Sequence, residues 1–145
     1  MITAFYGITL RIPAGWEDIT DALADGSPPT IAKASGVGAV QFSISKYQSG
    51  EHPDADFNAL KSLMMGFCQN NQIEIDHVSE SEYGRVKCAS IFSENGSKVI
   101  SAWLLSNGKG FALVTYVALG EENDEIAGEL DQAREMVSSI SFDTQ

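Results

Sequence analysis

The sequence predicts an α+β domain in which an antiparallel β-sheet of about six strands is sandwiched between helices. The stretch from Tyr83 to Leu119 reads as three strands joined by two short turns. Both turns contain Asn-Gly, a pair that tolerates the positive φ values of hairpin turns. The last two strands are apolar on both alternations, which is typical of central strands covered on both faces. Two amphipathic stretches supply a helix for each face.

The chain has the composition of one globular domain, which we assign to residues 1–145. Of its 145 residues 43% are hydrophobic, with 13 Gly and only 4 Pro, which is ordinary for a folded protein. It contains no internal repeat, low-complexity tract or linker that would divide it.

The N-terminal third predicts several short strands. Residues 3–12 alternate weakly and suggest a strand, or a short hairpin kinked at Gly7, that stops at the turn Pro13-Ala14-Gly15-Trp16. Residues 17–23 suggest a further short strand. The proline pair in the loop 25–29 excludes a helix there, and residues 30–33 are short and extended.

Residues 37–46 predict a half-exposed strand, because apolar residues at every second position alternate with Gln41 and two serines. The preceding Gly36-Val37-Gly38 begins like a dinucleotide-binding fingerprint. Gln41 stands at the position of the third glycine, however, and a strand follows instead of a helix. We interpret the two glycines as a flexible entry to the strand.

Two helices are expected, over residues 54–70 and 123–138. Asp54 and Asp56 supply capping and negative charge at the start of the first helix, and Asn70-Asn71 suits its end. Its apolar residues recur at helical spacing: Phe57, Leu60, Met64 and Phe67. The second helix has an equivalent stripe: Ile126, Leu130, Ala133 and Val137. Short strands are predicted at 73–78 and 140–142.

The net charge limits the classes of partner. Twenty acidic residues against nine basic ones give −11, a field that repels nucleic acids and anionic membranes and favours a basic protein partner. Acidity that serves solubility alone is the alternative. The chain lacks the features of a signal peptide and any apolar stretch long enough to span a bilayer. We therefore expect a cytoplasmic protein without membrane insertion.

The search for chemistry is largely negative. His52 and His77 lie in unrelated segments without metal-ligand spacing, and His77 is expected to be half-buried on a strand. Cys68 and Cys88 are expected to be buried, reduced thiols. The sequence has no nucleophile elbow, phosphate-binding loop or EF-hand loop. We expect no catalytic residue, no metal and no cofactor, and therefore no enzyme.

The candidate interface residues lie at the edges of the predicted sheet. Trp16 and Tyr47 are at strand ends, where they could form an interface rim. The acidic residues before and in the last helix could steer a basic partner: Glu121, Glu122, Asp124 and Glu125. A solvated helix start matched to the helix dipole is the alternative. Because the central strands should be covered on both faces, binding is expected at such edges, including the loop 28–38.

The opening YGITLRIPAGWED, the central WLLSNGKGFALVTYVA and the closing ELDQAREMVSSISF resemble the PsbP-like fold superfamily. The resemblance covers nearly the whole chain, and its motifs are structural. The superfamily includes the extrinsic photosystem II subunit, the Mog Ran-GTPase-binding proteins and a bacterial branch with the Eag-type chaperones of type VI secretion. The resemblance implies an antiparallel sheet between helices and a non-enzymatic protein that binds another protein.

These observations favour a protein-binding module. The specific hypothesis is a cytosolic bacterial partner of a secreted effector or toxin, acting as its immunity protein or as a chaperone or adaptor. The first alternative is a small-molecule or lipid-binding protein of the same fold. The second, less favoured, is an enzyme that uses carboxylates alone.

Overall fold

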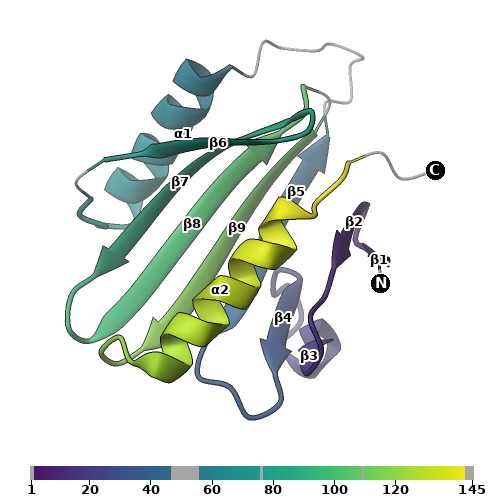
Figure 1. Ribbon diagram of the computed structural model, residues 1–145, viewed down its shortest axis with the longest axis vertical. Helices are drawn as coiled ribbons and strands as arrows, with labels where there is room; N and C mark the ends of the chain where they lie inside the picture. The colour runs from purple at the N-terminus through teal and green to yellow at the C-terminus, as the bar shows by residue number, and fades with distance from the viewer. Residues whose placement is uncertain (1, 47–55, 76, 109, 143–145) are drawn as a thin grey trace.

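A seven-stranded sheet forms the centre of the computed structural model, which describes residues 2–46, 56–75, 77–108 and 110–142. The strand order is β3-β4-β5-β9-β8-β7-β6, and every neighbouring pair is antiparallel (Figure 1). The strands are β3 (Trp16–Asp18), β4 (Thr30–Lys33), β5 (Ala39–Lys46), β6 (Ser79–Tyr83), β7 (Val86–Glu94), β8 (Lys98–Ser106) and β9 (Gly110–Leu119).

A separate hairpin precedes the sheet and consists of β1 (Ile2–Phe5) and β2 (Ile8–Arg11). Its turn residues Tyr6 and Gly7 both have positive φ, which explains the predicted kink at Gly7. The strand expected at 140–142 is a single bridge to this hairpin. In that bridge Thr9 and Ser141 exchange two backbone hydrogen bonds of 2.9 Å.

The predicted meander over residues 83–119 is confirmed as β7, β8 and β9, which pair along almost their whole lengths. The side chain of Asn95 accepts hydrogen bonds from the backbone N–H groups of Ser97 and Lys98 and closes the first turn. Gly96 and Gly108 adopt the positive φ that the two turns require. Local turn chemistry therefore determines the register of the sheet's centre.

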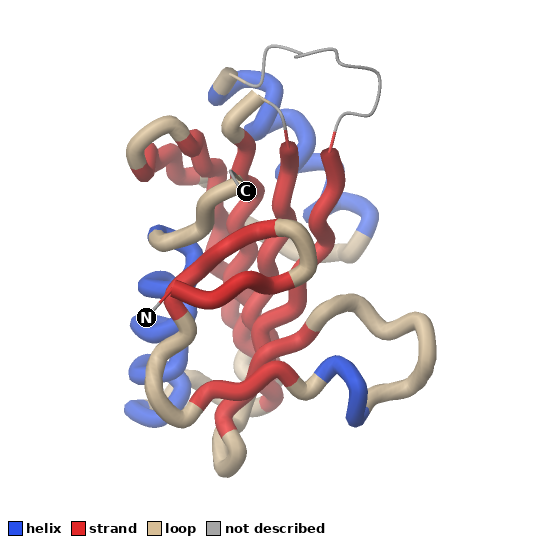
Figure 2. Tube along the Cα trace, turned by 90° about the vertical axis from the view of Figure 1, so that its right-hand side faces the viewer, coloured by secondary structure: helices blue, strands red, loops and turns tan. Residues whose placement is uncertain are grey.

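The two helices lie on opposite faces of the sheet (Figures 1 and 2). Helix α1 (Phe57–Asn70) begins at Asp56, whose carboxylate accepts a hydrogen bond from Ala59 N–H at 2.8 Å. Helix α2 (Asp124–Ser138) begins at Asn123, whose side chain caps Ile126 N–H in the same way. Both predicted helices are confirmed, and Asp54 lies outside the described residues.

The sheet separates two hydrophobic cores of unequal size. The larger core lies between the sheet, α2 and the β1–β2 hairpin, and it includes Leu10, Trp16, Phe42, Trp103 and Leu130. The smaller core lies under α1 and includes Leu60, Met64, Ile91 and Leu104. No helix of the described residues is long and apolar enough to cross a membrane.

Three details of the predicted fold are wrong. In the described residues the main sheet has seven strands where about six were expected, and two further strands form the separate hairpin. Residues 73–75 and 77–78 form no strand, because Ile73 N–H bonds back to Cys68 C=O at the end of α1, and β6 starts only at Ser79. The segment 17–23 is strand only to Asp18 and then turns into a 3-10 helix, η1 (Thr20–Ala22).

Candidate functional site: an open groove beside helix α1

The sandwich of sheet and helices is incomplete on one face. Helix α1 has 14 residues and is therefore ~21 Å long. Like any α-helix it is ~10 Å wide, enough to cover about two strands spaced ~4.8 Å apart. It packs against β7 and β8. On the same face, only the start of β9 is reached by the smaller core under α1, at Phe111 and Leu113, and the rest of β9 and β5 are left without a helix. The expectation that the central strands are covered on both faces is therefore wrong for the second half of β9.

A groove of about 330 Å³ occupies this uncovered face. Its floor is formed by Ile100 of β8 and by Leu113, Thr115 and Val117 of β9. One wall comes from the end of α1 and the residues that follow it, namely Phe67, Asn71 and Ile73. The opposite wall comes from Pro28, Gln41 and Ser43. The lining therefore combines aliphatic side chains with amides and hydroxyls.

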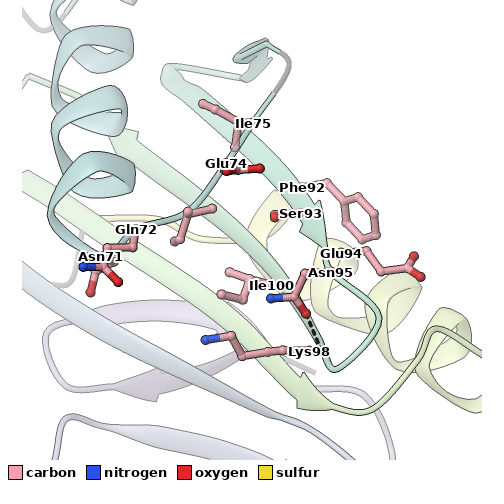
Figure 3. Close-up of a pocket in the computed structure, with 11 residues that line it drawn as sticks. Asn71, Gln72, Glu74, Ile75, Phe92, Ser93, Glu94, Asn95, Lys98 and Ile100 are labelled. Carbon is pink, nitrogen blue, oxygen red and sulfur yellow. Dashed lines mark hydrogen bonds between the residues drawn. The ribbon is translucent and has the colours of Figure 1, made fainter.

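A second, larger depression of about 970 Å³ continues the groove towards the sheet edge. The two share Asn71, Ile73, Lys98 and Ile100. This depression lies between the loop 71–75 and the end of β7 (Figure 3). Its charged side chains are Glu74, Glu94 and Lys98, so carboxylates outnumber the single amine. We call the two depressions together the open groove.

Exposed apolar side chains flank the open groove. Val117 is 37% exposed and Leu119 74% exposed, both on the face of β9 that α1 leaves uncovered. On α1 itself, Leu63 is about half exposed. A third pocket of about 330 Å³ between α1 and β9 is almost wholly apolar: Leu63, Met64, Phe67, Leu104, Phe111 and Leu113. An apolar surface of this kind is typical of binding sites.

Trp16 does not lie at an interface rim. It is 5% exposed in the larger core, and its indole N–H donates to the Gln132 side chain of α2 at 2.8 Å. The turn after Pro13 directs the ring inward, where burial of a large aromatic side chain is favourable. This part of the candidate interface is therefore wrong. Tyr47 lies outside the described residues.

The four acidic residues of the candidate interface are all exposed: Glu121, Glu122, Asp124 and Glu125. They lie in the β9–α2 loop and the first turn of α2. Gly120 N–H bonds to Ser97 C=O at 2.8 Å, so this loop is tied to the β7–β8 turn at the end of the open groove. Asp124 and Glu125 also stand where the helix dipole favours negative charge.

Among the described residues, the one charged side chain that is fully buried is one that the sequence did not single out. Glu129 of α2 is 1% exposed and accepts three hydrogen bonds. The donors are Val37 N–H at 2.8 Å, Gly38 N–H at 2.9 Å and the Tyr116 hydroxyl at 2.7 Å. This carboxylate therefore joins the loop before β5, helix α2 and the central strand β9. We call the arrangement the Glu129 clasp.

The clasp explains the glycine pair that resembled a nucleotide motif. A Cβ atom on Gly36 would stand 2.8 Å from a carboxylate oxygen of Glu129, and one on Gly38 would stand 2.6 Å from the Tyr116 ring. Both distances are shorter than side chains tolerate. The glycines are therefore needed for close approach, and the interpretation of a merely flexible entry is replaced by a packing requirement.

The two cysteines are free and buried, as expected. They lie on opposite sides of the sheet, Cys68 in the smaller core and Cys88 in the larger one. His77 is exposed in a loop and not half-buried on a strand, whereas His52 lies outside the described residues. Among the described residues, no three His, Cys, Asp or Glu side chains are grouped so that they could hold a metal ion.

Burial of Cys88 and Tyr116 predicts loss of stability at high pH. Burial raises the pKa of the Cys88 thiol to about 12 from 9.0. Burial also raises the pKa of Tyr116, and the hydrogen bond to Glu129 raises it further. Both groups keep their protons longer in the folded state. The free energy of unfolding should therefore fall above pH 9, by up to about 1.4 kcal/mol per pH unit for one such group, and more steeply above pH 10.

Urea denaturation between pH 7 and 10.5 measures this dependence. A Cys88→Ala variant should show a flatter profile between pH 9 and 10 than the unmodified chain. Equal slopes in the two proteins would show that the thiol is not the group that titrates.

The open groove was missed by sequence reasoning, although two signals point to it. Gln41 and Ser43 place polar side chains on the α1 face of β5, and Thr115 does so on β9. The single helix α1 is also too narrow to cover a sheet of seven strands. The position of α1 over β7 and β8, which decides where the groove lies, is set by tertiary packing.

Comparison with known proteins identifies the fold but no family. No protein-family model matches the chain, and no curated protein matches it in sequence. Among solved structures, the Ran-binding protein Mog1p of Saccharomyces cerevisiae superimposes with a TM-score of 0.59 at 10% identity, over 94% of this chain and 90% of Mog1p. LpqN of Mycobacterium tuberculosis, described as involved in cell envelope biogenesis, gives 0.61 at 16% identity, over 92% and 82%.

A protein of Bacteroides thetaiotaomicron gives a TM-score of 0.59 at 14% identity. The match covers 96% of this chain, which spans about half of that protein (46%). At these identities the likeness concerns the fold alone. It supports a fold like that of Mog1p.

Proposed function

We propose that this chain is a non-enzymatic module that binds a segment of another protein in the open groove. The observation that carries the proposal is the uncovered α1 face of β9. Val117 and Leu119 are exposed there beside a groove lined by aliphatic, amide and hydroxyl groups. Protein interfaces commonly combine an apolar centre with such polar groups.

The partner is best matched by a basic protein. The chain carries a net charge of −11, and four exposed acidic residues gather in the β9–α2 loop and first turn of α2. Such a field accelerates association with a positively charged partner and depends on ionic strength. The fold likeness to a protein described as Ran-binding is compatible with a protein partner.

In its specific form, the proposal is a cytoplasmic bacterial protein that binds a secreted effector or toxin, as its immunity protein or as its chaperone or adaptor. The negative charge supports a toxin or effector with a basic surface. The apolar flank of the open groove supports a chaperone that shields an apolar segment before secretion.

Substitution at the groove tests the proposal. Val117→Lys places a positive charge on the groove floor, and Tyr6→Lys places the same charge on the β1–β2 hairpin, where Tyr6 is 50% exposed. In affinity capture from the native host at low salt, we expect Val117→Lys to reduce recovery of the partner at least tenfold, because a buried unpaired charge weakens binding by about 1.4 kcal/mol or more.

The matched Tyr6→Lys variant should recover the partner as the unmodified protein does. Equal recovery by all three proteins would place the interface elsewhere and remove the groove from the proposal. Thermal unfolding of each variant establishes that a loss of binding is not a loss of folding.

A small apolar ligand is the second candidate function. The pocket between α1 and β9 is almost wholly apolar and its volume of about 330 Å³ lies at the lower end of ligand pockets. Native mass spectrometry of freshly purified protein should then show an added mass that a Leu63→Asp substitution removes. Unmodified protein that carries no added mass would exclude a tightly held ligand.

A further inference from the structure

We infer that the partner segment binds in an extended conformation and pairs with the free edge of β7 as an additional strand. The inference rests on the proposed function and deepens it, because it names how the segment is held. It concerns the larger depression of the open groove, which lies beside the end of β7.

The last four residues of β7 have an unpaired edge. Strand β6 pairs with β7 only as far as Ser90, opposite Ser79. Strand β7 continues through Ile91 to Glu94, and on its other side it remains paired with β8. No described residue pairs with this stretch on the side where β6 has ended. Unpaired strand edges are templates for an added strand.

The backbone groups that point outward can be identified from the turn. Asn95 N–H bonds to Lys98 C=O, so these two residues form a hydrogen-bonded pair across β7 and β8. Such pairs alternate along an antiparallel ladder, so Ser93 also bonds to β8, whereas Phe92 and Glu94 do not. The N–H and C=O groups of Phe92 and Glu94 therefore point away from β8, towards the free edge.

The side chains of the edge indicate what the added strand carries. Phe92 and Glu94 project to one side of β7 (Figure 3), and Phe92 is 42% exposed. A residue opposite Glu94 would meet a carboxylate, which favours Lys or Arg. A residue opposite Ser93 would point to the other side, into the depression lined by Ile73 and Ile75. The occupant is therefore a segment that alternates basic and aliphatic residues.

A synthetic probe tests this geometry before the natural partner is known. The probe is an acetylated and amidated peptide of four Lys-Val repeats, added to the full chain labelled with ¹⁵N. In the free protein the amides of Phe92 and Glu94 should exchange faster with solvent than that of Ser93, which is bonded to β8. Saturating peptide should slow exchange at Phe92 and Glu94 about tenfold or more and leave Ser93 unchanged.

Two control peptides separate the contribution of charge from that of backbone hydrogen bonds. A Glu-Val repeat should bind at least about tenfold more weakly, because like charges would face Glu94. A Lys-Val peptide with N-methyl groups on alternate residues should no longer protect the amides of Phe92 and Glu94 from exchange, since it cannot donate hydrogen bonds to the edge.

On the protein side, Phe92→Pro removes one outward N–H without breaking a bond to β8, and Phe92→Thr retains that N–H. The proline variant should bind the peptide about tenfold more weakly than the threonine variant.

Peptide binding that leaves exchange at Phe92 and Glu94 unchanged would overturn the strand-pairing inference, as would absence of binding at millimolar peptide. The proposed function is judged separately, by the effect of Val117→Lys on capture of the native partner. A partner that depends on Val117 but leaves the β7 edge exchanging freely would uphold the function and reject this mode of binding.

Discussion

Replacing Glu129 by alanine is expected to lower the free energy of unfolding by about 3–5 kcal/mol, because it removes a buried charged acceptor from three donors. The N–H groups of Val37 and Gly38 and the hydroxyl of Tyr116 would all lose their partner in the core. Urea denaturation monitored by tryptophan fluorescence measures the change.

Glu135→Ala is the matched control. Glu135 lies on the same helix but is exposed, so its removal should change stability by no more than about 0.5 kcal/mol. Glu129→Gln keeps the shape but presents an amide N–H₂ group to donors, and it should be destabilising by about 1–3 kcal/mol. If Glu129→Ala and Glu135→Ala unfolded at the same urea concentration, the clasp would not stabilise the fold.

Replacing Gly38 by alanine is expected to lower the free energy of unfolding by about 2–3 kcal/mol. The added Cβ would come within 2.6 Å of the Tyr116 ring, which is fully buried and cannot move without disturbing the core. The displacement would also lengthen the hydrogen bond from Tyr116 to Glu129. Differential scanning calorimetry should show the loss as a lower Tm.

Gly66→Ala provides the comparison for the Gly38 substitution. Gly66 lies inside α1 with open space around its Cα, so alanine should stabilise the helix by up to about 1 kcal/mol. The two substitutions therefore change the same residue type in opposite directions. A Gly38→Ala protein as stable as the unmodified chain would show that the loop before β5 adjusts freely, and that the glycine is not required for packing.

The elements that local chemistry specifies were predictable from the sequence. Asn95-Gly96 and Asn107-Gly108 mark the two turns of the meander, and Asp56 and Asn123 mark the starts of the helices. The capping residues accept hydrogen bonds from backbone N–H groups a few positions away, and the Asn-Gly pairs allow the backbone to turn at their own positions. Such short-range signals do not depend on how the elements pack.

The features that depend on tertiary packing were not predictable in the same way. Residues 73–78 alternate like a strand, but Ile73 is bonded to the end of α1 and the strand starts only at Ser79. The role of Glu129 depends on a loop some 90 residues away, with which it forms hydrogen bonds. Trp16 was a candidate for an interface rim because the sequence does not reveal that Gln132 of α2 accepts its N–H.

The location of the groove follows from the same limitation. The sequence showed that the central strands are apolar on both faces, and it offered a helix for each face. It did not show that α1 packs over β7 and β8 and leaves β9 exposed at Val117. The sign of that arrangement in the sequence was the polar α1 face of β5, where Gln41 and Ser43 lie.

Photo-crosslinking in the native host is the sharpest test of the groove as a protein-binding site. A benzophenone amino acid is placed at Val117, on the groove floor, and separately at Tyr6, on the β1–β2 hairpin. We expect irradiation to join one protein partner to the Val117 variant and none to the Tyr6 variant. A partner captured from Tyr6 and not from Val117 would place binding on another surface and refute the role of the open groove.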